Sequence, residues 1–529
     1  MSEKLYFNGD ILTMENELYV EALLIKDDKI FKTGSKDQLI KVASKEVEFI
    51  DLQGKTLMPS FIDSHSHFSG YATSLLQVSV EESTNFNDII DSIQNFIKKN
   101  NIKSGEWISV KGYDHNNLTE KTHPTKEILD KAAPNNPVAL QHQSGHNGVF
   151  NSKALDILNI KSETPNPSGG IIEKENGEPT GYVEENAYVN NIQKVPMPSM
   201  EDLSTALVKA QDTYASYGIT TMQEGMIVPM LGDILDLLRV KKLLKLDLIG
   251  YIDLRDYEIL VKRFNSCIKK YENHLKIGGY KIFLDGSPQS RTAWMLEPYK
   301  NGEANYMGYP IYEDNALTEK VTLAIKDDMQ LLAHCNGDAA CKQYINAYND
   351  AIKNAHTKND IRPVIIHAQL LRKDQLDDVK RLNMIPSFFV AHVYHWGDIH
   401  VENFGFERAS SISLANSALK KGIKFTFHQD SPVIEPNMLE TVWCSVNRIT
   451  KKGIVLGEDE RIEPLEALKA VTINAAYQYF EEDLKGSLKE NKLADLIILN
   501  ENPLKVDKMD IKSIKVLETI KEGKTIFKL

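Results

Sequence analysis

The residues best suited to chemistry are histidines and one aspartate that follow short apolar runs. His65 and His67 come directly after the run 57–63. Because side chains i and i+2 of a strand point the same way, these two imidazoles can bind one ion together. Later runs end in a further three residues: His334, His367 and Asp430. Imidazole and carboxylate are the usual ligands of Zn²⁺, and they also suit iron, cobalt and manganese, so these residue types predict a divalent-metal site.

Each of these residues is weak evidence when taken alone. A single histidine after an apolar run is more often a hydrogen-bonded packing residue than a metal ligand, and a His-x-His pair often arises by chance. Their common position is much harder to obtain by accident, because they all stand where separate runs end. The combination therefore predicts the site, although no member does.

The elements that must position these residues are eight apolar runs that alternate with longer helical stretches: 57–63, 219–222, 246–253, 277–284, 330–333, 363–366, 384–390 and 423–427. This rhythm is typical of βα units and a parallel sheet. Eight such units can close a TIM-like (β/α)₈ barrel, in which the carboxyl ends of the strands converge on the face that carries the active site. The sequence thus predicts an α/β fold with a barrel over residues 59–480.

The two ends of the chain have a different pattern. Residues 4–58 and 493–529 contain short alternating segments separated by turn signals such as Asn8-Gly9, which is typical of antiparallel strands. Neither end alone could bury a sheet face, so we expect residues 1–58 and 481–529 to form one small β-sandwich. About 150 residues separate the first two barrel runs, which is far more than one helix needs. We therefore expect an insertion at about 70–205, with strand-like runs at 107–110 and 137–140.

Composition limits the possible partners and location. The formal net charge of −12 argues against nucleic-acid and anionic-membrane binding, because both require excess Lys and Arg. The sequence contains no run of 18 or more apolar residues, so no membrane span is expected. The first ten residues carry an acid at position 3 and do not resemble a signal peptide. The four cysteines form no Cys-x-x-Cys pair. These features favour a cytoplasmic protein with reduced thiols and a small-molecule substrate.

Lys281 lies in the fourth run, four residues before Asp285. A lysine with an ordinary pKa of ~10.4 is a cation and a poor neighbour for a metal. If carbon dioxide carboxylates it, Lys281 becomes an anion whose two oxygens can bridge two ions. If it is unmodified, it pairs with Asp285. Spacing does not choose between these alternatives.

Residues 57–67, Leu-Met-Pro-Ser-Phe-Ile-Asp-Ser-His-Ser-His, resemble the opening signature of the amidohydrolase superfamily. The chain more closely resembles the YtcJ-like branch, amidohydrolase family 3, which includes N-substituted formamide deformylases. The resemblance extends through further stretches: 144–155, 168–187, 280–293, 334–339, 362–369, 392–398, 425–432, 466–476 and 492–496. It covers essentially the whole chain.

The resemblance implies a mononuclear or binuclear centre, usually zinc, on a barrel with a sandwich made from both chain ends. Its implied ligands are His65, His67, Lys281, His334, His367 and Asp430. It favours the carboxylated, bridging form of Lys281, and a homodimer would be ordinary for the family. It also suggests residues for the substrate pocket: His146, Asp285, Arg291 and His392. Each of these could instead only hold loops together. Glu224, after the second run, is a further polar candidate.

Two segments depart from the family pattern. Many relatives have an Arg-rich segment before the glycine-histidine pair, whereas this chain has Gln141-His142-Gln143; residues 386–391 are bulkier than usual. We expect both segments to line the substrate pocket, so a relative's substrate cannot be transferred directly.

The predicted activity is hydrolysis of a non-peptide carbon–nitrogen bond in an N-acyl or N-formyl small molecule. A metal-activated hydroxide would attack the carbonyl, and Asp430 would act as general base. A deaminase or cyclic-amide hydrolase on the same scaffold is the main alternative, since the metal chemistry is shared. Lys281 distinguishes a deaminase from the amide-type hydrolases, because deaminases of this type usually use one metal and no such lysine. A non-catalytic, metal-stabilised binding protein is least favoured, since structural sites are closed.

Overall fold

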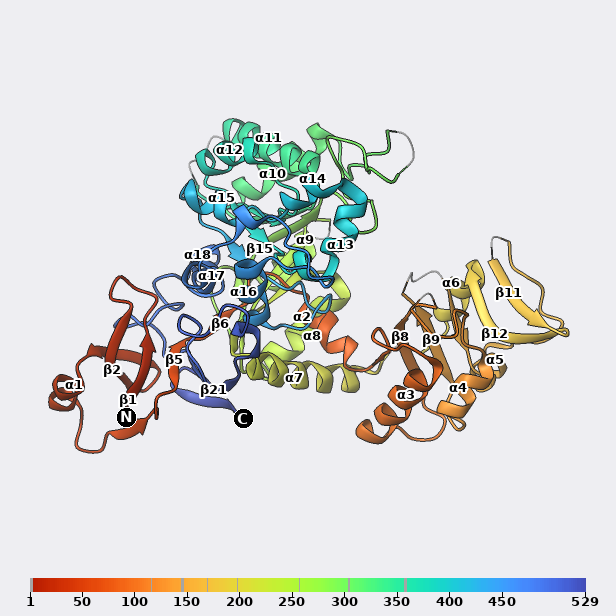
Figure 1. Ribbon diagram of the computed structural model, residues 1–529, viewed down its shortest axis with the longest axis horizontal. Helices are drawn as coiled ribbons and strands as arrows, with labels where there is room; N and C mark the ends of the chain where they lie inside the picture. Colours follow the sequence, from red (N-terminus) through yellow and green to blue (C-terminus); the bar gives the residue numbers. More distant parts are fainter. Residues whose placement is uncertain are drawn as a thin grey trace. The chain divides into compact units, whose positions relative to one another are not determined.

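The computed structural model describes residues 3–115, 117–143, 147–168, 170–196, 198–255, 257–302, 305–355 and 359–529. The chain forms two compact units (Figure 1). The larger unit comprises Met1–Gly70 and Val208–Leu529, and the smaller unit comprises Tyr71–Leu207. The sequence predicts different boundaries: a sandwich of residues 1–58 plus 481–529, and a barrel of residues 59–480 with an insertion at about 70–205. These boundaries stay a prediction.

A parallel sheet of eight strands forms the centre of the larger unit, and its strands follow one another in chain order. They are β6 (Phe61–Ile62), β13 (Ile219–Ile227), β14 (Asp247–Asp253), β15 (Leu275–Phe283), β16 (Gln330–Cys335), β17 (Val364–His367), β18 (Ile385–Phe388) and β19 (Thr426–Phe427). Every neighbouring pair is parallel. Each predicted run contributes one strand to this parallel sheet, and the α/β class is confirmed.

Hydrogen bonds connect the segments that follow the first and last strands of this sheet. The Ser64 hydroxyl donates to the carbonyl of Phe427 at 2.9 Å. The backbone N–H of Asp430 donates to His65 O at 3.2 Å, and that of His67 donates to Ser431 O at 2.8 Å. The sheet is therefore curled, with its two edges brought together at their carboxyl ends.

Helices connect these strands and cover the sheet. In chain order they are α7 (Met200–Ser216), α8 (Pro229–Val240), α9 (Tyr257–Arg263), α10 (Asp314–Lys326), α11 (Asp338–Ala355), α12 (Leu376–Arg381), α13 (His392–Phe404), α14 (Phe406–Ser410), α15 (Ala415–Lys420), α16 (Met438–Asn447), α17 (Pro464–Ala470) and α18 (Ile473–Gln478); α2 (Phe68–Ser74) follows β6. In α11, Cys341, Tyr344, Ile345 and Tyr348 are buried. Their spacing of three and four residues places them on one face of the helix, which packs against the core. No described helix is long and apolar enough to cross a membrane.

Both chain ends contribute to a second sheet of the larger unit, ordered β22-β21-β20-β5-β1-β2-β3 with β4 beside β1. Its strands are β1 (Glu3–Leu12), β2 (Tyr19–Lys26), β3 (Lys29–Gly34), β4 (Glu48–Asp51), β5 (Thr56–Pro59), β20 (Leu496–Leu499), β21 (Val516–Lys521) and β22 (Lys524–Lys528); α1 (Lys36–Val42) follows β3. The two termini meet where β5 pairs with β20. They form one continuous sheet, and a separate two-layer sandwich stays a prediction.

The first predicted run is divided between these two sheets. Thr56–Pro59 forms β5 of the terminal sheet, whereas Phe61–Ile62 forms β6 of the parallel sheet. Both strands are fully buried. Because a continuous apolar run carries no mark of a change of sheet, the sequence pattern shows one strand here.

The smaller unit contains a six-stranded sheet ordered β11-β12-β10-β9-β8-β7. Its elements are β7 (Val78–Ser79), α3 (Phe86–Asn100), β8 (Ile108–Tyr113), α4 (Lys126–Ala132), β9 (Val138–His142), β10 (Asn147–Phe150), α5 (Ser152–Leu158), β11 (Gly170–Glu175), β12 (Glu178–Glu185) and α6 (Asn186–Ile192). Strands β7, β8 and β9 are parallel. The expected strand-like runs at 107–110 and 137–140 correspond to β8 and β9, and Val110, Leu129 and Leu140 lie in the core between sheet and helices.

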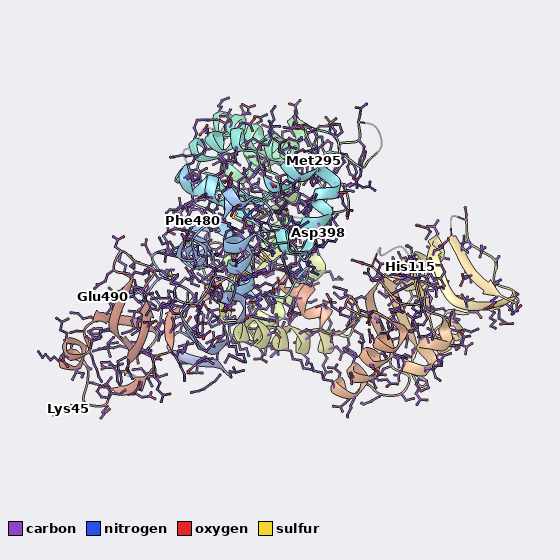
Figure 2. All side chains as sticks on the ribbon, viewed as in Figure 1. Lys45, His115, Met295, Asp398, Phe480 and Glu490 are labelled. Atoms are coloured by element: carbon purple, nitrogen blue, oxygen red, sulfur yellow. The ribbon has the colours of Figure 1, made fainter. Side chains whose placement is uncertain are left out.

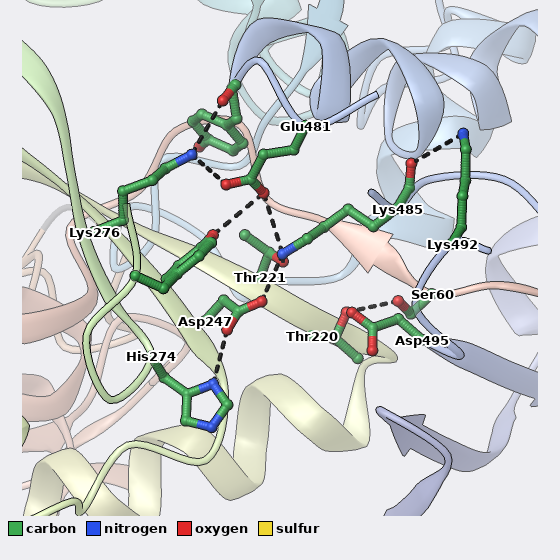
Figure 3. A network of polar contacts seen from close by, with 12 residues as sticks. Ser60, Thr220, Thr221, Asp247, His274, Lys276, Glu481, Lys485, Lys492 and Asp495 are labelled. Carbon is green, nitrogen blue, oxygen red and sulfur yellow. Dashed lines mark hydrogen bonds and ion pairs between the residues drawn. The ribbon is translucent and has the colours of Figure 1, made fainter. Parts of the chain in front are cut away.

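A buried ionic network joins the two sheets of the larger unit (Figure 3). Lys485 Nζ lies 2.5 Å from Asp247 Oδ2 and 3.1 Å from Glu481 Oε2. Lys521 Nζ, from β21, lies 2.9 Å from the same Asp247 oxygen and 3.0 Å from Asp495 Oδ2. Burial alone would lower the pKa of Lys485, but Asp247 and Glu481 hold it above its ordinary value. The lysine therefore stays charged.

Replacing Lys485 with Met should destabilise the protein strongly, because it leaves buried carboxylates without this cation. Breaking a buried pair in this way costs about 3–5 kcal/mol. Urea unfolding followed by circular dichroism should show a lower midpoint. Lys489→Met is the matched control, since Lys489 is exposed and surface changes usually stay within about 0.5 kcal/mol. Equal midpoints for the two variants would contradict a stabilising role for the network.

Candidate metal centre

The two histidines after β6 point into the carboxyl end of the parallel sheet. His65 Nε2 lies 3.5 Å from Asp430 Oδ1, and His67 Nε2 lies 3.7 Å from the same oxygen. Each residue offers one ligand atom, and these atoms all lie within 4.8 Å of one another. The intervening Ser66 is directed elsewhere, since its hydroxyl donates to Gln223 O. Because β6 ends at Ile62, both histidines lie in the segment after the strand, and this segment, rather than strand alternation, presents the two imidazoles together.

The other predicted ligands join the same cluster. Lys281 of β15 places Nζ 3.2 Å from His65 Nε2. His367, the last residue of β17, lies 3.9 Å from Asp430 Oδ2 through Nε2, and its ring centroid is 4.7 Å from that of His334 in β16. The structure therefore brings together all six predicted ligands, called here the strand-end cluster: His65, His67, Lys281, His334, His367 and Asp430. Their role as ligands remains a prediction.

Two members of the strand-end cluster have left-handed backbone conformations. The φ angle is +70° at His367 and +56° at Asp430. Non-glycine residues adopt this region at some energetic cost, in turns and at functional sites. Here the unusual turn follows the strand end and directs both side chains toward the same space.

The donor set fits a divalent metal ion. Asp430 Oδ1 is buried and accepts no hydrogen bond from the described residues, which is costly for a carboxylate unless a cation balances it. Burial holds the pKa of His65 and of His367 well below the ordinary value, so both imidazoles are neutral and have a lone pair available. Burial also raises the pKa of Asp430. Neutral imidazoles around an unbonded carboxylate oxygen are what such an ion requires.

Lys281 has an unusual electrostatic environment. The side chain is buried, and burial lowers the pKa of Lys281 to about 7. Near neutral pH a large fraction of this amine is therefore uncharged. An uncharged amine can act as a nucleophile, which an ordinary surface lysine rarely can.

Gln223 and His428 orient the cluster, although the sequence pattern assigns neither a role. Gln223 Oε1 lies 2.6 Å from His65 Nδ1, and Gln223 Nε2 donates to Ser64 O at 2.8 Å. His428 Nε2 lies 3.0 Å from His367 Nδ1. Such partners fix ring orientation and leave the opposite nitrogen facing the site. The spacing His428-x-Asp430 repeats that of His65 and His67, and this signal could have revealed His428.

Glu224 and Asp285 contact two of the clustered histidines. Glu224 Oε1 lies 3.8 Å from His67 Nδ1, while Oε2 accepts the N–H of Ser69. Asp285 Oδ1 lies 3.3 Å from His334 Nδ1. Its carboxylate also accepts three backbone N–H groups, from residues Trp294, Asn336 and Gly337. Asp285 thus positions the loop beside His334, and contact with substrate stays a prediction.

Of the remaining predicted pocket residues, His392 is connected to the strand-end cluster through the Phe389 ring, which also lies against His367. Arg291 is exposed and donates to Asn301 O at 2.9 Å. His392 is buried at the start of α13, with Nδ1 3.0 Å from His400 Nε2 and its ring against Phe389. His146 lies outside the described residues. Their substrate-binding roles stay predictions.

The chain belongs to the amidohydrolase family, whose profile matches residues 48–527. This confirms the resemblance stated above. The chain is 27% identical to the amidohydrolase YtcJ of Bacillus subtilis (strain 168) over 536 residues, covering 99% of both chains. It is 25% identical to the N-substituted formamide deformylase of Arthrobacter pascens over 543 residues, covering 99% of this chain and 98% of that protein.

Solved structures agree with the family. An uncharacterized metal-dependent hydrolase from Pyrococcus furiosus superposes with a TM-score of 0.76 at 26% identity, covering 95% of this chain and 100% of that chain. A second, from Pyrococcus horikoshii OT3, has the same TM-score at 25% identity and covers 96% of this chain and 99% of that chain. Together with the candidate ligand groups, these findings make the chain a hydrolase that uses a divalent metal.

Replacing Gln223 with Leu should weaken metal binding about 10–100-fold, because loss of an orienting partner lets the His65 ring rotate. Titration of the chelator-stripped protein with Zn²⁺ against a chromophoric competitor measures this. Gln343→Leu is the control, since Gln343 is also buried but bonds to Tyr312 O and Asp314 Oδ1 instead of to a predicted ligand. Unchanged affinity in Gln223→Leu, or an equal loss in the control, would show that Gln223 does not orient a ligand.

Proposed function

We propose that this hydrolase cleaves a carbon–nitrogen bond in an N-acyl or N-formyl small molecule, and that its curled sheet is a (β/α)₈ barrel with the reaction at its carboxyl face. The observation that carries the proposal is Asp430 Oδ1, which is buried beside the His65 and His67 imidazoles and accepts no hydrogen bond from the described residues. The relative from Arthrobacter pascens, named for the deformylation of N-substituted formamides, aligns over 99% of this chain. That similarity supports an amide-type substrate.

The strand-end cluster would hold one or two divalent ions, with zinc proposed from its imidazole and carboxylate donors. When bound, such an ion lowers the pKa of water from ~15.7 towards ~7 and polarises a carbonyl. The protein supplies the fixed geometry: His65 and His67 approach Asp430 from β6, and His334 and His367 from β16 and β17.

Asp430 would act as the general base and then as the general acid. Its carboxylate takes a proton from the attacking water as the oxygen bonds to the carbonyl carbon. When the carbon–nitrogen bond breaks, the same proton passes to the departing nitrogen, and the products are a carboxylic acid and an amine. Burial raises the pKa of Asp430, and a base whose pKa moves toward the working pH is better suited to both transfers.

Lys281 would be carboxylated and bridge two ions. Its uncharged amine attacks carbon dioxide, a nitrogen–carbon bond forms, and one proton leaves, so that a carbamate anion results. Burial makes this step accessible because it lowers the pKa of Lys281 to about 7. The alternative, in which a single-metal deaminase uses no such lysine, gives no account of an amine 3.2 Å from a predicted ligand.

Asp430→Asn should lower kcat by about 10²–10⁴-fold, since it removes the proton acceptor, while much of the bound metal is retained. Release of carboxylic acid from a panel of N-substituted formamides and N-acyl amines measures turnover, and elemental analysis measures metal. Asp398→Asn is the control, because Asp398 bonds to Thr450 away from the cluster. Full activity of Asp430→Asn would exclude the assignment, and release of ammonia alone would favour deamination.

Brief mild acid treatment of the purified protein should remove a mass equal to one carbon dioxide, because carbamates decompose when protonated. Intact mass spectrometry before and after treatment measures the loss, and the untreated protein should contain two metal ions per chain. Lys281→Met should show neither the loss nor the second ion. One metal ion with no change of mass would contradict the bridging carbamate and favour a mononuclear enzyme.

A further inference from the structure

A second group of metal-ligand types lies within the smaller unit. Asp114 and His115 directly follow β8, and His142 is the last residue of β9. The two strands are parallel neighbours, and Tyr113 stands opposite His142. The carboxyl ends of two adjacent parallel strands therefore bring the three residues together, called here the 114–142 cluster (Figure 2 labels His115).

The three potential ligand atoms form a compact triangle. His115 Nδ1 lies 3.3 Å from His142 Nε2, and Asp114 Oδ1 lies 3.8 Å from the first and 3.7 Å from the second. In a tetrahedral zinc site with bonds of about 2.0–2.1 Å, ligand atoms are about 3.3–3.4 Å apart. Shifts of a few tenths of an ångström in the positions of the three ligand atoms would give this spacing. All three distances join the same three atoms.

Local backbone features direct these side chains. Gly112 has a φ of +93°, and the pairing of β8 with β9 shifts register between Lys111 and Tyr113. Residues with a Cβ rarely adopt this φ, and a Cβ here would also come within 2.2 Å of Glu81 Cγ, so both features favour glycine. Bulges of this kind re-aim the side chains that follow. Here they deliver Asp114 and His115 to the end of β9.

Neighbouring rings pack against the two imidazoles of the 114–142 cluster. The Tyr113 ring packs edge-on against His142 with centroids 5.0 Å apart. The His123 ring lies 4.1 Å from that of His115, and His123 Nδ1 is 2.9 Å from the Tyr113 hydroxyl. These contacts hold the His115 and His142 rings in the positions described above.

The exposure of the cluster suits a bound ion with one exchangeable position. Its side chains are 24% exposed at Asp114, 30% at His115 and 11% at His142, so solvent reaches them. A contrasting group of similar composition lies in the larger unit around Asp247, His274 and Glu522. There Asp247 already contacts two lysines, Lys485 and Lys521, and an ion would meet their positive charge.

We propose that Asp114, His115 and His142 bind one zinc-type divalent ion within the smaller unit, with the fourth position open to water or an anionic ligand. Two nitrogens and one carboxylate oxygen are the donor set of open zinc sites. The site is additional to the strand-end cluster and shares no residue with it.

The test counts zinc in the full chain after the strand-end cluster has been disabled by His65→Asn and His67→Asn. The chelator-stripped protein is equilibrated with Zn²⁺ and desalted, and bound zinc is measured by mass spectrometry. We expect one equivalent to remain in this background. Adding Asp114→Asn or His142→Gln should remove it, whereas the control His395→Gln should not, since His395 pairs with Glu440 elsewhere.

A second measurement does not depend on the folding of the background variant. In the otherwise unaltered chain, the isosteric Asp114→Asn should bind one zinc equivalent fewer than the parent and should lose one tetrahedral Co²⁺ component from the visible spectrum. Absence of zinc from the background variant while it remains folded would overturn the proposal. Unchanged stoichiometry in Asp114→Asn and His142→Gln would overturn it as well, and neither result depends on the chemistry proposed for Asp430.

Discussion

The candidate site depends on the meeting of the first and last strands of the parallel sheet. His65 follows the first strand of the parallel sheet and Asp430 follows the last, yet the N–H of Asp430 donates to the carbonyl of His65. The N–H of His67 donates in turn to Ser431 O. These bonds use backbone groups of the very residues whose side chains face the metal site. A backbone hydrogen bond fixes the positions of the two groups it joins to a fraction of an ångström. The bonds that close the sheet therefore also fix the positions of the predicted ligands.

The two ends of the parallel sheet handle buried charge differently. At the amino end, Lys485 contacts both Asp247 and Glu481 (Figure 3). Lys521 also contacts Asp247, so each carboxylate has a cation beside it. At the carboxyl end, Asp430 Oδ1 accepts no hydrogen bond from the described residues and lies beside the His65 and His67 rings. Satisfied pairs stabilise a fold, whereas an unsatisfied carboxylate is tolerated where something must bind. The contrast agrees with the general division of such sheets into a stability face and an active face.

Much of this arrangement can be predicted from sequence because it follows strict periodicities. All eight apolar runs became strands, since buried parallel strands leave continuous apolar signatures. The ligand types stand at the ends of these runs, so their convergence follows from topology alone. Other features depend on tertiary contacts without a local mark. Gln223 sits inside β13 and reaches His65 through the fold, and the division of the first run between β5 and β6 leaves no trace in hydropathy.

The 114–142 cluster shows where reasoning from strand ends falls short. The runs at 107–110 and 137–140 are strands, and both strands continue past the apolar run. Strand β8 ends at Tyr113, directly before Asp114, and β9 ends at His142, which is itself a member of the cluster. The bulge at Gly112 displaces Asp114 and His115 by one position from the simple alternation. A rule that looks only at the residue after an apolar run therefore passes over them. The physical principle is the same in both units: parallel strands deliver their carboxyl ends to one edge, and polar side chains placed there meet whatever their separation in the chain.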